Sequence, residues 1–136
     1  SHELTYPTLL DLPPPDIRAY PPATVIAEKF QAMVQLGIAN GRMKDYYDLW
    51  AMPQALDVSD DELDAAIAAT FARRGTEIPI DRPPGLSEEM TQDGTKQSQW
   101  AAYAESIDLE KVSLEEVIET IWSMVGSACK RIAQSK

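Results

Sequence analysis

Apolar residues recur at helical spacing in several blocks of the chain, and these blocks predict helices. The first helix is expected from about Pro22 to Leu36, because a proline suits the first turn and Gly37 can end the helix. The second is expected from about Arg42 to Met52, since Pro53 disfavours its continuation. One face of the first helix carries Ala23, Ile26, Ala27, Phe30, Met33 and Val34.

The second half of the chain predicts three more helices. Ser59 followed by Glu62 forms the capping-box pattern at the start of the third helix, and residues 73–75 (Arg-Arg-Gly) are typical of a helix end. A fourth helix is expected around Trp100, and Ser113 is expected to cap a fifth. The buried stripe of the fifth helix is Leu114, Val117, Ile118, Ile121, Val125, Ala128 and Ile132.

These elements predict an all-α fold of about five helices, because residues 6–10 can form one short strand but no second credible strand is visible to pair with it. Residues 3–20 are expected to form an extended arm, since three consecutive prolines at 13–15 exclude regular strand pairing. Residues 1–2 have the appearance of a tag remnant. We expect residues 21–136 to form a single helical domain with a Pro- and Gly-rich connector at about 76–94.

Composition and charge narrow the function classes. The chain has 136 residues with a formal net charge of −10, and this balance repels a phosphate backbone. The sequence therefore excludes a free-standing nucleic-acid-binding domain, and any attraction for nucleic acid has to come from a local patch or from a partner. No signal peptide and no apolar run long enough to span a membrane are visible, so we expect a cytoplasmic protein.

Cysteine and histidine are almost absent. Cys129 is the one cysteine and lies in an apolar helical pattern, so a buried thiol is expected and an internal disulfide is excluded. His2 is the one histidine, which leaves no histidine-based metal site and no Ser/His/Asp triad within the chain.

Lys29 is the first candidate for chemistry. It lies on the flank of an apolar helix face, with Val25, Ala32, Met33 and Leu36 as its neighbours at helical spacing. A lysine in such a position either extends its ammonium group to water or directs it at a buried partner. The spacing alone favours extension to water, and a functional role is the alternative.

The segment from Arg42 to Asp48 is the second candidate. Asp45 and Asp48 lie one helical turn apart and share a face with Arg42. Paired carboxylates can bind a divalent cation whose shell is completed by water and phosphate oxygens. They can also pair with Arg42 and Lys44, and the spacing alone favours such a solvated or salt-bridged face.

The arginine pair Arg73-Arg74 is the third candidate. Two arginines together can hold a phosphate group. They also stabilise the negative end of a helix dipole, and this structural interpretation is favoured by their position at the end of the predicted third helix.

Several of these motifs together resemble the AbiEii/AbiGii nucleotidyltransferase toxin family. The resemblance is carried by YPPATVIAEKFQAM at 20–33, GIANGRMKDYYDLW at 37–50, ATFARRGTEIP at 69–79 and the pair Gln99-Trp100. It covers most of the chain from Tyr6 onward. The A-E-K element and the R-x-K-D-x-x-D element, in this order and at this distance, are the most specific parts.

The resemblance implies the helical carboxy-terminal half of a polymerase-β-like nucleotidyltransferase. It implies transfer of a nucleotide from an NTP, with Mg²⁺, to an acceptor such as tRNA, by a toxin that a cognate antitoxin silences in phage defence or growth control. Lys29 and Asp45 are the implied catalytic residues, and no metal ligand is expected in this chain. The implied substrate-binding residues are Arg42, Lys44 and Asp48.

In the family, a Gly-Ser loop and a D-x-D metal motif belong to the nucleotide-binding half. No D-x-D motif occurs in these 136 residues, and no Gly-Ser loop precedes a strand in them. We therefore expect a missing amino-terminal nucleotide-binding half as a partner of this helical half, and we expect neither activity nor a bound cofactor for this chain alone. A non-catalytic module that binds an antitoxin or another protein is the alternative function, and a helical domain with relic motifs is a third. We also expect a homodimer formed through the arm and the first helix near Val25 and Leu36, because contiguous apolar surface favours association.

Overall fold

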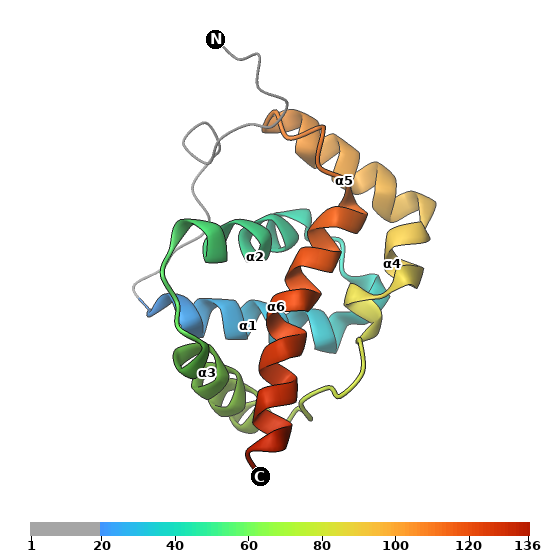
Figure 1. The fold of residues 1–136 in the computed structure, drawn as a ribbon. Coiled ribbons are helices and arrows are strands. Elements are labelled where there is room, and N and C mark those ends of the chain that lie inside the picture. The colour runs from blue at the N-terminus through green and yellow to red at the C-terminus, as the bar shows by residue number, and fades with distance from the viewer. Residues whose placement is uncertain (1–19) are drawn as a thin grey trace.

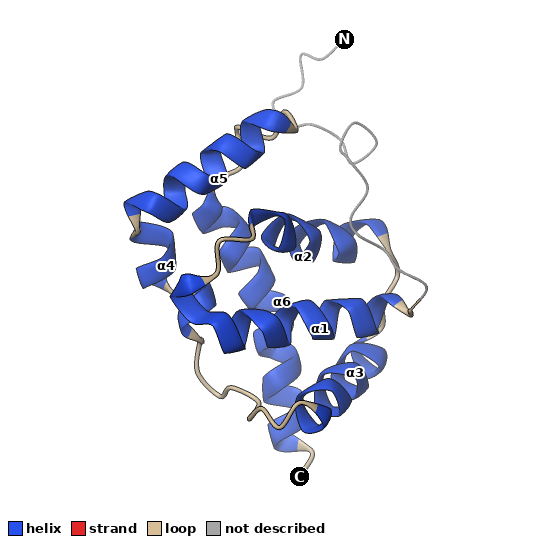
Figure 2. Ribbon diagram, turned by 180° about the vertical axis from the view of Figure 1, so that it is seen from behind, coloured by secondary structure: helices blue, strands red, loops and turns tan. Residues whose placement is uncertain are grey.

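The computed structural model describes residues 20–136, and within them every regular element is helical (Figures 1 and 2). The all-α fold class is therefore confirmed, with six α-helices in the described residues where about five were expected. The extended arm predicted at 3–20 lies almost wholly outside the described residues. The elements are α1 (Pro22–Leu36), η2 (Gly37–Ala39), α2 (Met43–Ala55), α3 (Asp60–Arg73), η3 (Pro84–Leu86), α4 (Glu88–Gln92), α5 (Gly94–Ser106) and α6 (Leu114–Gln134).

Helices α1 and α2 lie side by side and run in opposite directions (Figure 1). The α1 helix has the predicted bounds, with a proline in its first turn and Gly37 at its end. Gly37 has a φ of 60°, a conformation that glycine adopts without steric cost, and its N–H donates to the Met33 carbonyl. The chain can therefore turn at once into the short segment that leads to α2.

The α2 helix is buried on nearly all sides, which its weak amphipathic pattern did not indicate. Its buried residues are Met43, Asp45, Tyr46, Tyr47, Asp48, Leu49, Ala51 and Met52. The predicted end at Pro53 was wrong, because Pro53 lies inside the last turn. The turn persists since Leu56 N–H donates to the Met52 carbonyl at 2.9 Å and the Gln54 amide donates to the Trp50 carbonyl at 2.7 Å.

The predicted capping box of α3 and the predicted N-cap of α6 both form. Ser59 Oγ accepts a hydrogen bond from Glu62 N–H at 3.1 Å, and the Glu62 carboxylate accepts one from Ser59 N–H at 2.9 Å. Ser113 Oγ accepts from Glu116 N–H at 3.0 Å. Each cap satisfies backbone donors that a helix start leaves unpaired. The apolar stripe of α6 is buried apart from half-buried Ile132, and Cys129 on the same helix is a buried free thiol.

The connector folds back onto the α1–α2 pair through η3. The phenol of Tyr46 donates to the Gly85 carbonyl at 2.7 Å inside the protein. A Cβ atom at Gly85 would lie 2.7 Å from the Met33 carbonyl oxygen, so only glycine permits this close approach. The segment therefore fixes the carboxy-terminal end of α1 relative to α2.

Two residues of the surface that we expected to drive dimerisation, Val25 and Leu36, lie within the described residues. Val25 is buried, and Leu36 is partly exposed at 44%. The arm residues of that predicted surface lie outside the described residues. The homodimer therefore stays a prediction.

Candidate functional site

The site forms where Lys29 of α1 meets the acidic face of α2. Lys29 Nζ donates to Asp45 Oδ1 at 3.0 Å and lies 3.2 Å from Asp48 Oδ2. Only 12% of the lysine side chain is exposed. Extension of Lys29 to water was therefore the wrong expectation, and the predicted convergence of Lys29 and Asp45 between two antiparallel helices is confirmed.

Two further cations complete the network around the aspartates. Arg42 Nε lies 3.1 Å from Asp45 Oδ2, and Lys44 Nζ contacts both oxygens of Asp48 at 3.1 and 3.2 Å. The side chains of Arg42 and Lys44 are 68% and 54% exposed, whereas that of Asp48 is fully buried. The aspartates thus form a salt-bridged face, as one of the two interpretations predicted, but the face is buried and not solvated.

Burial and charge act against each other at Lys29. Burial by itself lowers the pKa of the Lys29 ammonium, but the hydrogen bonds and negative charges of Asp45 and Asp48 outweigh it and raise the pKa above its ordinary value. Lys29 is consequently a permanent cation at neutral pH. The phenol of Tyr103 lies near the carboxylate of Asp48. Its burial, and then the negative charge of Asp48, raise the pKa of Tyr103 to about 12.

A buried lysine from α5 holds the loop that carries Arg42. Lys96 Nζ donates to the Asn40 carbonyl at 3.0 Å, and Asn40 Oδ1 accepts from Arg42 N–H at 2.9 Å. Both Lys96 and Asn40 are buried. The backbone entry to α2 is therefore fixed from two sides, which restricts the position of Arg42 above Asp45.

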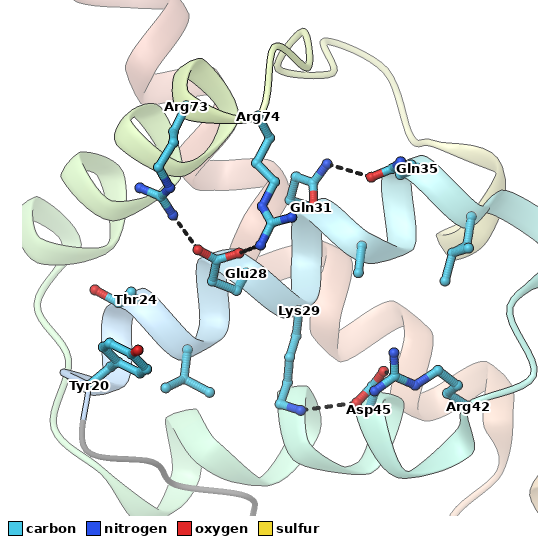
Figure 3. Close-up of a pocket in the computed structure, with 13 residues that line it drawn as sticks. Tyr20, Thr24, Glu28, Lys29, Gln31, Gln35, Arg42, Asp45, Arg73 and Arg74 are labelled. Carbon is cyan, nitrogen blue, oxygen red and sulfur yellow. Dashed lines mark hydrogen bonds and ion pairs between the residues drawn. The ribbon is translucent and has the colours of Figure 1, made fainter.

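A pocket of about 830 Å³ opens beside this network (Figure 3). Its walls include Lys29, Arg42 and Asp45, together with Glu28 of α1 and the arginine pair at the end of α3. Four cations and two carboxylates line the pocket, giving it a net charge of +2 in a chain whose net charge is −10. Lys44 and Asp48 do not line it.

Arg73 and Arg74 reach across to α1 and meet the carboxylate of Glu28. Arg74 Nη2 lies 2.8 Å from Glu28 Oε1, and Arg73 Nη2 contacts Glu28 Oε2. Figure 3 shows Glu28 turned toward these arginines while Lys29 points the other way, toward Asp45. The arginine pair therefore joins two helices and also forms one wall of the pocket.

The aspartate pair does not fit a divalent cation. All four of its carboxylate oxygens already contact an ammonium or guanidinium group, and three cations lie within 3.2 Å of them. A Mg²⁺ ion needs such oxygens for its own coordination shell and is repelled by adjacent positive charge. Within residues 20–136, no group of three or more acidic, histidine or cysteine side chains is arranged to hold a metal ion.

Sequence reasoning missed three residues that shape this site. Glu28 was passed over because a glutamate on a helix flank is common, and Lys96 because its partner is a distant backbone carbonyl. Tyr46 was missed as well, although its position beside Asp45 in a motif was a usable signal. For Glu28 and Lys96 the partners are 45 and 56 residues away, which sequence spacing does not reveal.

Fold and site together define an all-helical protein with a cationic pocket beside a buried lysine–aspartate network. The family model described as "Nucleotidyl transferase AbiEii toxin, Type IV TA system" matches residues 1–122. The chain therefore belongs to the AbiEii nucleotidyltransferase toxin family, whose description pairs a toxin with an antitoxin. No curated protein and no solved structure matches the chain. None of the helices within residues 20–136 combines the length and apolarity that a membrane span requires.

Proposed function

We propose that this chain supplies the phosphate-binding side of a nucleotidyltransferase site, with the pocket beside Lys29 taking the phosphates of an NTP. The observation that carries the proposal is the gathering of four cations around one pocket in a chain of net charge −10. Such local reversal of the overall charge concentrates an anionic ligand where it is needed. Family membership adds the reaction class.

Lys29 and Asp45 are the proposed catalytic residues, because both line the pocket. A cation held rigidly by two carboxylates stabilises charge that develops on phosphate oxygens without having to reorganise during the reaction. Arg42 is the proposed phosphate ligand. Its Nε is engaged by Asp45, and two thirds of its side chain remains exposed to the pocket and solvent.

Asp48 is better suited to positioning than to the substrate binding first predicted. Its carboxylate is fully buried and holds Lys29 from the side away from the pocket. Lys44 does not line the pocket. If it binds substrate, as first predicted, it contacts a part of the substrate that lies outside the pocket.

The full reaction in this proposal is transfer of a nucleotide from an NTP to an acceptor such as tRNA, with Mg²⁺ held by the family's nucleotide-binding half and with an antitoxin as regulator. Phosphate binding by these 136 residues alone revises our expectation that they bind no cofactor. Transfer by these residues alone is still not expected, because the D-x-D motif that the family resemblance assigns to the metal does not occur in them.

Calorimetric titration of a non-hydrolysable NTP into the 136-residue chain tests the proposal. Arg42→Gln removes an exposed guanidinium and is expected to weaken binding about tenfold. Lys111→Gln removes an exposed lysine outside the pocket and is the control, with an expected change below about twofold. Equal affinities for the wild type and both variants, or no binding at all, would contradict the proposal.

A further inference from the structure

The arginine pair of α3 has no task in the reaction proposed at Lys29. Arg73 and Arg74 lie on the opposite side of α1 from the Lys29–Asp45 contact, yet they line the same pocket (Figure 3). Their side chains are 56% and 51% exposed, and the Glu28 side chain between them and α1 is 30% exposed. The cluster is therefore open to solvent and to a ligand.

The geometry of the cluster is that of an anion site filled by a side chain. Each oxygen of the Glu28 carboxylate contacts one of the two guanidinium groups. Two oxygens of a phosphate group can make the same pair of contacts, since guanidinium groups bind carboxylates and phosphates in the same planar manner. An exposed ion pair is weak, so a phosphate can exchange with the carboxylate at small cost.

We propose that Arg73 and Arg74 form a second phosphate subsite of the pocket, and that Glu28 occupies this subsite until a phosphate displaces it. The inference rests on the proposed function for the class of ligand. Nucleotide transfer brings together two phosphate-bearing substrates, and this pocket has one cationic cluster on its α2 side and one on its α3 side. The phosphate comes from the NTP or from the acceptor strand.

The contacts of Arg73 and Arg74 are not needed merely to hold α3 against α1. Helix α3 already packs along α1 through the Phe30–Phe71 ring contact, with centroids 5.2 Å apart. Just after the end of α3, the Gln31 amide also donates to the Thr76 hydroxyl at 3.0 Å. One arginine would suffice to complement the dipole at the end of α3. Two arginines on one carboxylate, both facing a pocket, exceed that requirement.

The experiment compares two variants of the same chemical change. Glu28→Gln removes the occupying carboxylate, and Glu119→Gln is its matched control, because Glu119 also pairs with an arginine but lies outside the pocket. The paired Arg73→Gln/Arg74→Gln variant removes the subsite. Affinities are measured for a non-hydrolysable NTP by calorimetry and for a short single-stranded RNA by fluorescence anisotropy, and thermal unfolding verifies that each variant is folded.

Glu28→Gln is expected to bind one of the two ligands about fivefold more tightly than the wild type, because the competing anion is gone. Glu119→Gln is expected to change neither affinity by more than about twofold. The paired arginine variant is expected to weaken the same ligand about tenfold. The ligand that responds, NTP or RNA, identifies the source of the phosphate.

Unchanged or weakened binding of both ligands by Glu28→Gln, in a folded variant, would overturn the subsite. So would unchanged binding of both ligands by the paired arginine variant. Either result leaves the function proposed at Arg42 standing if Arg42→Gln still weakens NTP binding. Conversely, a response at Glu28 and the arginines without one at Arg42 would support the subsite and contradict the proposed site at Lys29.

Discussion

Glu28 and Lys29 are neighbours in the sequence, but they belong to two different electrostatic regions. Lys29 turns toward the carboxylates of α2, Asp45 and Asp48, which are 8% and 0% exposed. Glu28 turns toward the arginines at the end of α3 with a carboxylate that is 30% exposed (Figure 3). A helix turns about 100° per residue, so adjacent side chains can serve opposite flanks of α1.

The Lys29 network and the Glu28 cluster both pair carboxylates with cations, and they differ in how deeply the carboxylates are buried. In the buried region, removing one partner leaves a desolvated charge, so the geometry is strongly enforced. In the exposed cluster, water and salt compete with each contact, so the partners can exchange. We infer that the buried network fixes the position of a cation and that the exposed cluster is suited to releasing and binding anions.

The largest expected effect comes from breaking the buried network. Lys29→Met leaves Asp45 and Asp48 without their shared cation and is expected to lower the free energy of unfolding by about 3 kcal/mol. Urea denaturation measures this loss. The control Lys130→Met removes an exposed lysine from α6 and should cost less than about 0.5 kcal/mol. Equal losses in the two variants would contradict strong coupling at Lys29.

The next effect concerns the segment that fixes the end of α1 relative to α2. Gly85→Ala places a Cβ atom 2.7 Å from the Met33 carbonyl oxygen, so backbone must shift, and we expect a loss of about 2 kcal/mol in unfolding free energy. Gly94→Ala is the matched control, since a Cβ atom there meets nothing within 4 Å. If both variants unfold at the same urea concentration, the close approach of η3 to α1 is not a constraint.

The exposed cluster should give a much smaller change in stability. Glu28→Gln is expected to lower the free energy of unfolding by about 0.5 kcal/mol, because exposed ion pairs contribute little. The same urea experiment as for Lys29→Met makes the two regions directly comparable. A loss as large as that of Lys29→Met would show that the cluster is a structural clamp between α1 and α3.

The smallest expected effect is a change in the free energy of unfolding at alkaline pH. The pKa of Lys29 is higher in the folded protein than in the unfolded chain, where it is about 10.4. The stabilisation of the fold by the charged Lys29 is therefore complete below about pH 10.4, and it is lost as the pH rises through the folded pKa. We expect the stability difference between wild type and Lys29→Met to be constant from pH 7 to about 10 and to shrink above that range. Tyrosine ionisation contributes to both proteins and cancels in this difference. A difference that shrinks already between pH 7 and 9 would contradict the assignment.

Local signals in the sequence predicted the helices that carry them. The bounds of α1 follow from Pro22 and Gly37, and the start of α3 follows from Ser59 and Glu62, because each signal acts within one turn of the backbone. The end of α2 was predicted wrongly, since packing of a nearly fully buried helix outweighs the cost of Pro53 in its last turn.

The sequence allowed us to predict that the candidate residues come together, but not which other residues surround them. The motif spacing placed Lys29, Arg42 and Asp45 together, and the structure brings them to one pocket. The burial of Asp48, the support from Lys96 and the arginine wall of α3 depend on contacts between distant segments. No periodicity within a single helix carries that information.

A crystal structure of the 136-residue chain with a non-hydrolysable NTP tests the central claim most directly. We expect phosphate oxygens within hydrogen-bonding distance of the Arg42 guanidinium and beside Lys29, with the Lys29–Asp45 contact retained. A nucleotide bound in another pocket of the protein, or bound here with its phosphates directed away from Lys29 and Arg42, would contradict it.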